Sequence, residues 1–303
     1  MKLIGVDVDG TLLNSENKIT PKTRQALIRA GEMGHKIVIV SGRPTSAVKD
    51  LAKELKFDKF DGLLSNYNGG TITNYSSGKV LVNHNLDRNL ALEILDKTRF
   101  LNIIIPYKNM ILSDKDHKFL EAEKKLLGLE AKIVSDIRDK LDFDPNKILF
   151  AAEPENLEEN IPFLKENFGH KTSQVRSHRN YYEIMPKGLS KGNSLLEIAK
   201  IYGIDQADII AFGDEMNDAS MIKIAGTGVA MANAVEPIKN MADYLTLSND
   251  EDGIGVYLEK FVLWRPIKWG DIIVYFKNSI SDNHTSSNSR HGKPLCPSNY
   301  LDK

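Results

Sequence analysis

The sequence has a single cysteine, Cys296, among its 303 residues. One cysteine can form neither an internal disulfide nor a cysteine-rich metal site. No apolar run approaches the roughly 20 residues that a bilayer-spanning helix needs, so we expect no membrane partner. The N-terminus shows no signal-peptide pattern, and a cytoplasmic location is therefore the default expectation.

A strong charge of either sign is also missing. The chain has 40 Lys and Arg residues against 41 Asp and Glu residues, for a net charge of -1. Because a nucleic-acid backbone requires a basic face, this balance argues against nucleic acid as the main partner. With 41% hydrophobic and 27% charged residues, the chain is typical of a globular protein of one large domain or two. Composition leaves the oligomeric state open.

Strand-like and helix-like segments alternate at both ends of the first 262 residues. Apolar runs at 2–8 and 36–40 flank a helix that begins after Thr20 and Pro21. The alternation returns with a helix at 191–202 and a strand at 208–211. This order predicts an α/β fold with a Rossmann-like parallel sheet and right-handed connections.

The middle of the chain has a different character. Short strand-like pieces come in closer pairs there, for example 172–176 with 181–185. We therefore expect a discontinuous core domain at 1–80 and 186–262 and an inserted α+β cap domain at 81–185. The segment 263–303 is rich in Ser, Asn, His and Pro, which predicts a disordered or aberrant tail. We expect it to be either an appended interaction segment or a read-through or frameshift product.

Two aspartates one residue apart, Asp7 and Asp9, follow the first strand. Side chains two residues apart in an extended chain lie on the same face. The two carboxylates would repel each other, and a hard cation such as Mg²⁺ can offset that repulsion. One carboxylate could then act as a nucleophile and the other could transfer a proton. The alternative is a solvated strand end.

Three further polar groups follow at expected strand or helix ends. Ser41 and Gly42 come directly after the strand at 36–40, and a hydroxyl with a free backbone N–H suits phosphate oxygens. Lys191 stands at a helix start, where a nearby anion would stabilise it. The acidic segment 213–218 follows another strand and suits an oxygen-loving cation. Taken singly, the alternatives are a turn residue, a solvated lysine and a helix cap.

The order of these motifs resembles the haloacid dehalogenase (HAD) superfamily. The motifs are Asp7-Val-Asp-Gly-Thr-Leu-Leu13, Ser41-Gly-Arg43, Lys191 and Gly213-Asp-Glu-Met-Asn-Asp218. The position of the insertion resembles the Cof-type subfamily, which carries a class IIB α/β cap. Asn66-Tyr-Asn-Gly-Gly70 is similar to that subfamily's Asn-Gly segment, although Gly70 stands where alanine is common. The resemblance covers residues 1–261.

The resemblance implies a role for each motif residue. Asp7 would be the nucleophile and Asp9 the general acid and base. Mg²⁺ would be held by Asp7, the backbone carbonyl of Asp9 and Asp214, with Glu215 or Asp218 contacting it through water. The phosphoryl group would lie against the backbone N–H of Val8 and against Ser41, Gly42, Lys191 and Asn217.

The implied activity is that of a Mg²⁺-dependent phosphatase, a phosphoric monoester hydrolase of EC class 3.1.3. It would hydrolyse a small phosphorylated metabolite, such as a sugar phosphate, through an aspartyl-phosphate. Asp9 favours phosphatase or phosphomutase chemistry, since related ion-pumping ATPases carry threonine there and dehalogenases lack this aspartate. A sugar phosphomutase and a non-catalytic metabolite sensor on the same fold are the alternatives.

Substrate contacts in the cap are expected near a hairpin turn at 176–182, which gathers cations and aromatic side chains. The candidates are Arg179, Asn180 and Tyr182. They could bind a sugar or a second anionic group, or they could form a solvated turn.

Overall fold

The structure is a computed structural model that describes residues 1–263. The expected tail therefore lies outside the described residues, except for Leu263, which packs into the main hydrophobic core. The fold is α/β, with one large and one smaller sheet, as the sequence pattern predicts. Within residues 1–263 no helix combines the length and the apolar character that crossing a membrane requires.

The larger sheet has eight strands in the order β14-β13-β12-β1-β2-β3-β4-β5. The strands from β14 to β3 pair in parallel, and β4 and β5 continue the sheet in antiparallel fashion. The strands are β1 (Leu3–Val6), β2 (Lys36–Val40), β3 (Leu63–Asn66), β4 (Thr71–Asn74), β5 (Val80–Asn83), β12 (Ile209–Gly213), β13 (Thr227–Ala230) and β14 (Tyr244–Leu245).

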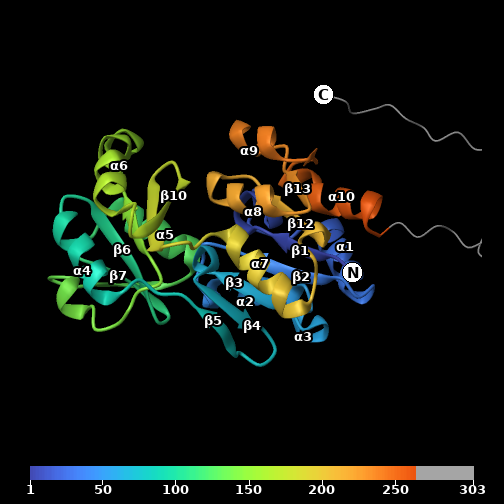
Figure 1. Ribbon diagram of the computed structural model, residues 1–303, viewed down its shortest axis with the longest axis horizontal. Coiled ribbons are helices and arrows are strands. Elements are labelled where there is room, and N and C mark those ends of the chain that lie inside the picture. The colour runs from blue at the N-terminus through green and yellow to red at the C-terminus, as the bar shows by residue number, and fades with distance from the viewer. Residues whose placement is uncertain (264–303) are drawn as a thin grey trace, which may run out of the picture. The chain divides into compact units, whose positions relative to one another are not determined.

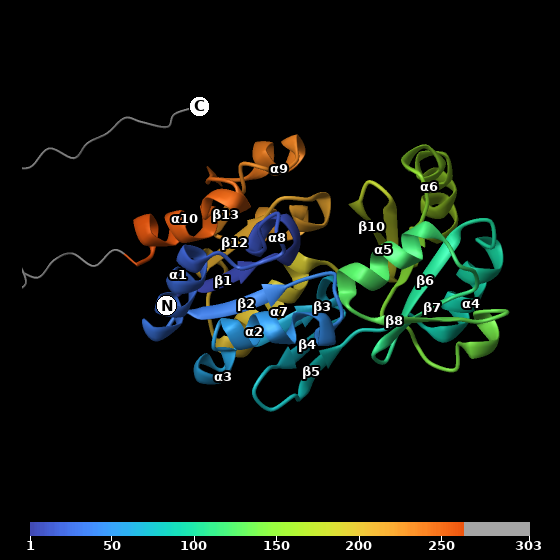
Figure 2. The same cartoon turned by 180° about the vertical axis from the view of Figure 1, so that it is seen from behind.

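Helices cover both faces of this sheet because its parallel strands are apolar on both sides. In β1, Ile4 and Val6 enter one hydrophobic cluster, whereas Leu3 enters the other. Figure 2 shows the side of the first cluster and Figure 1 the side of the second. The first is covered by α1 (Pro21–Glu32), α2 (Lys49–Glu54), α3 (Phe57–Phe60) and α10 (Gly253–Phe261), and the second by α7 (Lys191–Tyr202), α8 (Ala219–Ile224) and α9 (Glu236–Met241).

The middle of the chain, green in Figure 1, forms a second sheet with the order β10-β11-β9-β6-β7-β8. Its strands are β6 (Asn102–Tyr107), β7 (Met110–Ser113), β8 (Glu130–Ile133), β9 (Ile148–Ala151), β10 (Thr172–His178) and β11 (Tyr181–Pro186). Helices α4 (Arg88–Lys97) and α6 (Pro154–Phe168) pack on one face, and α5 (Lys118–Leu127) packs on the other. We call residues 88–186 the cap and the remainder of 1–263 the core.

The chain passes between the two sheets twice, after β5 and after β11. The larger sheet continues through β5 to Asn83, three residues beyond the boundary expected at residue 80. Helix α7 then begins at Lys191, where the Ser190 hydroxyl accepts a hydrogen bond from the backbone N–H of Asn193. It ends before Gly203, which adopts the left-handed conformation (φ 66°) that glycine tolerates best.

We predict that Phe150→Ala will destabilise the cap. The ring is fully buried in the core of the cap, so its loss should lower the free energy of unfolding by about 3–5 kcal/mol. Phe100→Ala is the control, because that ring is 57% exposed and should contribute about 1 kcal/mol or less. Urea denaturation followed by circular dichroism would measure both, and equal losses would contradict the assignment of this core.

Candidate active site

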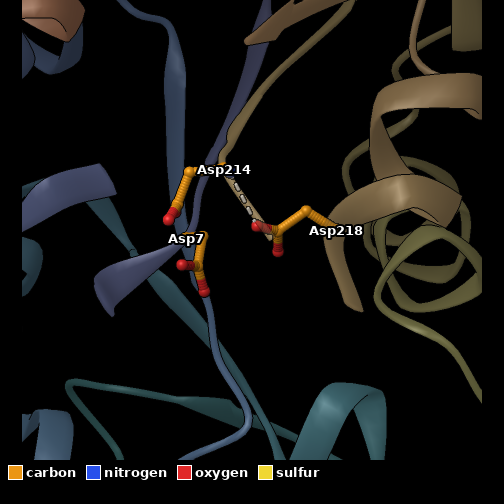
Figure 3. A group of neighbouring side chains, drawn as sticks. All are labelled: Asp7, Asp214 and Asp218. Carbon is orange, nitrogen blue, oxygen red and sulfur yellow. Dashed lines mark hydrogen bonds between the residues drawn. The ribbon is translucent and has the colours of Figure 1, made fainter. Parts of the chain in front are cut away.

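Three carboxylates meet at the carboxyl edge of the larger sheet (Figure 3). Asp7 follows β1, Asp214 follows β12, and Asp218 lies one turn further on. Each offers an oxygen atom that lies within 4.8 Å of those of the other two, and all three residues are buried. The parallel arrangement of β1 and β12 produces this convergence, because neighbouring parallel strands end at the same edge.

Lys191 neutralises part of this charge. Its Nζ atom lies 2.6 Å from Oδ1 of Asp7 and 2.6 Å from Oδ1 of Asp218. The other oxygen of Asp218 accepts hydrogen bonds from the backbone N–H groups of Asp214 and Glu215. Burial alone would lower the pKa of Lys191, but the two carboxylates outweigh it and raise that pKa above its ordinary value.

One ammonium group does not balance three carboxylates, and burial together with the excess negative charge raises the pKa values of Asp7 and Asp214. Burial and the nearby Asp218 raise the pKa of Asp7 to about 7, despite the opposing effect of Lys191. Burial, Asp7 and Asp218 together raise the pKa of Asp214 to about 9. The cluster as it stands therefore favours extra protons near neutral pH.

A divalent cation fits this cluster. One ammonium group faces three buried carboxylates, and oxygen ligands of this kind suit a hard cation. Gly10, with a φ of 75°, leaves the space in which Asp214 lies, since a Cβ atom there would collide with the Asp214 carboxylate. The Thr11 hydroxyl donates to Oδ1 of Asp214 at 2.5 Å and orients it.

Asp9 lies apart from the buried cluster and is held by Arg43. The Nε and Nη2 atoms of Arg43 lie 2.9 and 2.5 Å from the two Asp9 carboxylate oxygens. Arg43 is nearly buried, whereas half of the Asp9 side chain is exposed. This bidentate contact fixes the orientation of the Asp9 carboxylate.

The segment after β3 fixes the loop after β2 through hydrogen bonds. The backbone N–H of Asn68 donates to the carbonyl oxygen of Ser41, and the side-chain amide of Asn66 donates to that of Arg43. Ser41 is buried, and its hydroxyl accepts from the backbone N–H of Arg43. The Asn-Gly segment noted in the sequence thus supports the Ser41–Arg43 loop.

A cavity of about 490 Å³ opens onto these residues. Lys191, Asp218, Val8 and Ser41 are buried beside it and do not line it. Its lining from the core is Asp7, Asp9, Gly10, Gly42, Arg43, Asp214, Glu215 and Asn217. Its lining from the cap is Ala122, Glu123, Leu126, Leu127, Lys147, Leu149, Ser177, His178, Tyr181 and Glu183. We call it the central cavity.

A buried ion pair on the cap contacts the core at this cavity. Nζ of Lys147 lies 3.0 Å from Oε2 of Glu183, and it also donates to the carbonyl oxygen of Gly42 at 3.1 Å. The side-chain amide of Asn68 donates to the same Glu183 oxygen at 2.8 Å. The cap therefore binds directly to the Ser41–Arg43 loop and to the segment after β3 that supports it.

The three cap residues expected to contact substrate lie away from the central cavity. Arg179 is exposed at the hairpin turn, and the Asn180 amide donates to the carbonyl oxygen of Ala152. Tyr182 is buried in the cap core, where its hydroxyl donates to Gln174. Because side chains alternate along β11, Tyr181 and Glu183 face the cavity and Tyr182 faces away.

Sequence reasoning assigned no role to Arg43, Glu123, Lys147 or Glu183. Only Glu123 carries a visible signal in the sequence. It stands at helical spacing between Leu120 and Leu127, on a stripe where an apolar residue is the rule. The other contacts depend on how the cap and the core meet.

Comparisons with known proteins place this architecture in a family. The sequence model of haloacid dehalogenase-like hydrolases matches residues 4–258. The 5-amino-6-(5-phospho-D-ribitylamino)uracil phosphatase YwtE of Bacillus subtilis (strain 168) is 30% identical over 295 residues, which cover 86% of this chain and 98% of that protein.

Solved structures agree with this result. A haloacid dehalogenase-like hydrolase from Bacteroides thetaiotaomicron has 35% identity and a TM-score of 0.77, covering 86% of this chain and 98% of that one. The HAD subclass IIB sugar phosphatase BT4131 has 24% identity and a TM-score of 0.75, covering 87% of this chain and all of that one. This second comparison shows a similar fold.

The chain belongs to the haloacid dehalogenase-like hydrolase family. The family expected from the motifs is therefore confirmed, and the fold is like that of a HAD subclass IIB sugar phosphatase. The protein is a phosphoric monoester hydrolase that acts on phosphorylated small molecules.

We predict that the metal-free protein will lose stability as the pH rises from 7 to 9. Asp214 has a folded-state pKa of about 9 against an ordinary value of 3.8, so the native state holds a proton that the unfolded state has released. Stability falls with rising pH wherever the native state binds more protons than the unfolded state. Here the expected fall is several degrees of melting temperature. Thermal melts in EDTA would show this decrease of melting temperature with pH, and Mg²⁺ should remove it.

Asp214→Asn is the control for this melt, because the amide does not titrate. It should flatten the slope in EDTA and abolish the stabilisation by Mg²⁺. A wild-type melting temperature that stays constant or rises over this pH range would contradict the buried cluster.

We predict that Lys147→Met will destabilise the protein by about 3–5 kcal/mol, because it leaves Glu183 buried without a cation. The double variant Lys147→Met, Glu183→Met should recover most of that loss, since neither charge remains. Chemical denaturation of the three proteins would test this. Equal loss in the single and double variants would show that the ion pair does not act as a unit.

Proposed function

We propose that this protein is a Mg²⁺-dependent phosphatase that hydrolyses sugar phosphates or similar small phosphomonoesters through an aspartyl-phosphate on Asp7. The observation that carries the proposal is the convergence of Asp7, Asp214 and Lys191 beside a cavity that also contains Asp9. Each motif residue takes the role expected from the sequence, and the proposed metal ligands are Asp7, the backbone carbonyl of Asp9 and Asp214.

In the first half of the reaction, an oxygen of the Asp7 carboxylate attacks phosphorus and the bond from phosphorus to the leaving oxygen breaks. Asp9 donates its proton to that oxygen, and the alcohol departs. Asp9 is placed for this role because it lines the cavity outside the buried cluster. The bidentate contact with Arg43 favours the ionised carboxylate, so that contact must open when Asp9 carries the proton.

In the second half, Asp9 takes a proton from a water molecule whose oxygen attacks phosphorus. The bond between phosphorus and Asp7 breaks, which regenerates the carboxylate and releases inorganic phosphate. Lys191, the backbone N–H groups of Val8 and Gly42, and the side chains of Ser41 and Asn217 would hold the phosphoryl oxygens.

When bound, Mg²⁺ would supply positive charge against the repulsion between an anionic phosphate and the anionic Asp7. Lys191 already contributes part of this effect from its position 2.6 Å from Asp7. Gly10 and Thr11 maintain the position of Asp214, the other proposed carboxylate ligand.

We predict that Asp7→Asn will reduce kcat for p-nitrophenyl phosphate by about 10³-fold or more, because the amide is a poor nucleophile of similar shape.

Asp9→Asn should reduce steady-state turnover of the same ester by about 10²- to 10⁴-fold, because the amide cannot transfer the proton. Since p-nitrophenolate leaves without a proton, Asp9→Asn should also show a burst of p-nitrophenolate as phosphoenzyme accumulates. Rapid-mixing absorbance would detect it.

Asp58→Asn, a change at an exposed position of the core, is the control and should behave as wild type. Near-normal turnover in Asp7→Asn would refute the nucleophile assignment. Release of inorganic phosphate without a bisphosphate activator would contradict the phosphomutase alternative, and absence of any turnover by folded wild-type protein with Mg²⁺ would favour the sensor.

A further inference from the structure

Glu123 differs from the other buried charged residues of the protein. Seven charged side chains are buried in residues 1–263, and six of them have an ion-pair or hydrogen-bond partner. Glu123 is 7% exposed, and its carboxylate makes neither kind of contact with any part of the chain that the structure describes. Burial raises its pKa to about 7, against the lowering effect of Lys147.

The side chain of Glu123 lines the central cavity from the cap side. It belongs to α5, whose Leu126 and Leu127 give the same wall an apolar surface. Tyr181 lies within electrostatic range and is held by a hydrogen bond from its hydroxyl to the carbonyl oxygen of Phe119. A buried carboxylate without a partner is costly, and a donor group on a ligand in this cavity would satisfy it.

The charges around the cavity restrict what that ligand can carry. Six carboxylates and two permanent cations line it. Both cations are already engaged, Arg43 with Asp9 and Lys147 with Glu183 and the Gly42 carbonyl. Beyond the phosphate position, a second anionic group would therefore meet Glu123 without a free cation lining the cavity on the described part of the chain.

We propose that Glu123 is a specificity-determining residue that accepts hydrogen bonds from hydroxyl or ammonium groups of the leaving alcohol. The site thereby selects neutral or cationic sugar phosphates and rejects phosphomonoesters that carry a second acidic group. This inference rests on the proposed phosphatase function and names the class of its substrate. The apolar wall formed by Leu126 and Leu127 would contact the C–H surface of the sugar.

Three substrates of nearly equal size test the proposal. They are glucosamine 6-phosphate, glucose 6-phosphate and 6-phosphogluconate, with p-nitrophenyl phosphate as a reference that has no donor group. The wild-type kcat/KM should decrease in that order among the three, with 6-phosphogluconate at least about tenfold below glucose 6-phosphate. This ranking requires no variant, so it tests the proposal even if a substitution impairs folding.

Glu123→Gln keeps the shape of the side chain and removes its charge. The ratio of kcat/KM for glucosamine 6-phosphate to that for p-nitrophenyl phosphate should fall at least about tenfold, since a hydrogen bond to a charged group is lost. The discrimination against 6-phosphogluconate should fall as well. Glu121→Gln is the matched control, because Glu121 lies on the same helix, is exposed and pairs with Lys124.

The possible failures are distinguishable. If folded wild-type protein with Mg²⁺ does not hydrolyse p-nitrophenyl phosphate, the proposed function fails. If it hydrolyses that ester but prefers 6-phosphogluconate, or cleaves none of the three sugar esters, the proposed substrate class is wrong. If Glu123→Gln changes kcat/KM equally for all four esters, or for none, Glu123 does not determine specificity.

Discussion

The contact of Lys191 with two buried aspartates is the interaction on which the site depends. Without an ammonium group in this position, Asp7 and Asp218 would be adjacent buried anions, and either would have to bind a proton or leave the interior. The contact also joins three elements, because Asp7 follows β1, Asp218 follows β12 and Lys191 begins α7. Correct charge balance therefore requires a correctly assembled sheet edge.

In the cap, the alternation of side chains along a strand gives each face of β11 a different role. Along β11, one set of alternate side chains fills the cap's own core and the other set faces the central cavity. A strand thus separates residues that hold the cap together from residues that line the central cavity. The polar contact of Lys147 and Glu183 with Gly42 and Asn68 then ties the cavity-facing set to the core.

Much of the core could be predicted from the sequence, because the parallel strands are short apolar runs whose ends meet at one edge. The strand at Lys36–Val40 and the helix at Lys191–Tyr202 have the expected bounds. The positions of Asp7, Asp214 and Lys191 relative to one another followed from that edge. Their chemical roles stay predictions.

The cavity-facing residues of the cap could not be predicted in the same way. Tyr181, Tyr182 and Glu183 are all amphipathic or charged, so the local pattern does not say which face of β11 meets the core. The pairing of β11 with β9 and the packing of α5 decide this, and both are long-range contacts. The Asp9–Arg43 contact is likewise a tertiary contact between the ends of two strands.

The strand order has a consequence for the way the chain is made. β1 needs β12 as its neighbour, with Leu3 opposite Ile209, so the centre of the larger sheet stays incomplete until most of the chain has left the ribosome. The cap strands, in contrast, all lie in one continuous stretch, from Asn102 to Pro186. During synthesis the later-encoded insertion can therefore reach its native pairing before β1 does. Until then, one edge of β1 remains open to incorrect pairing with other nascent chains.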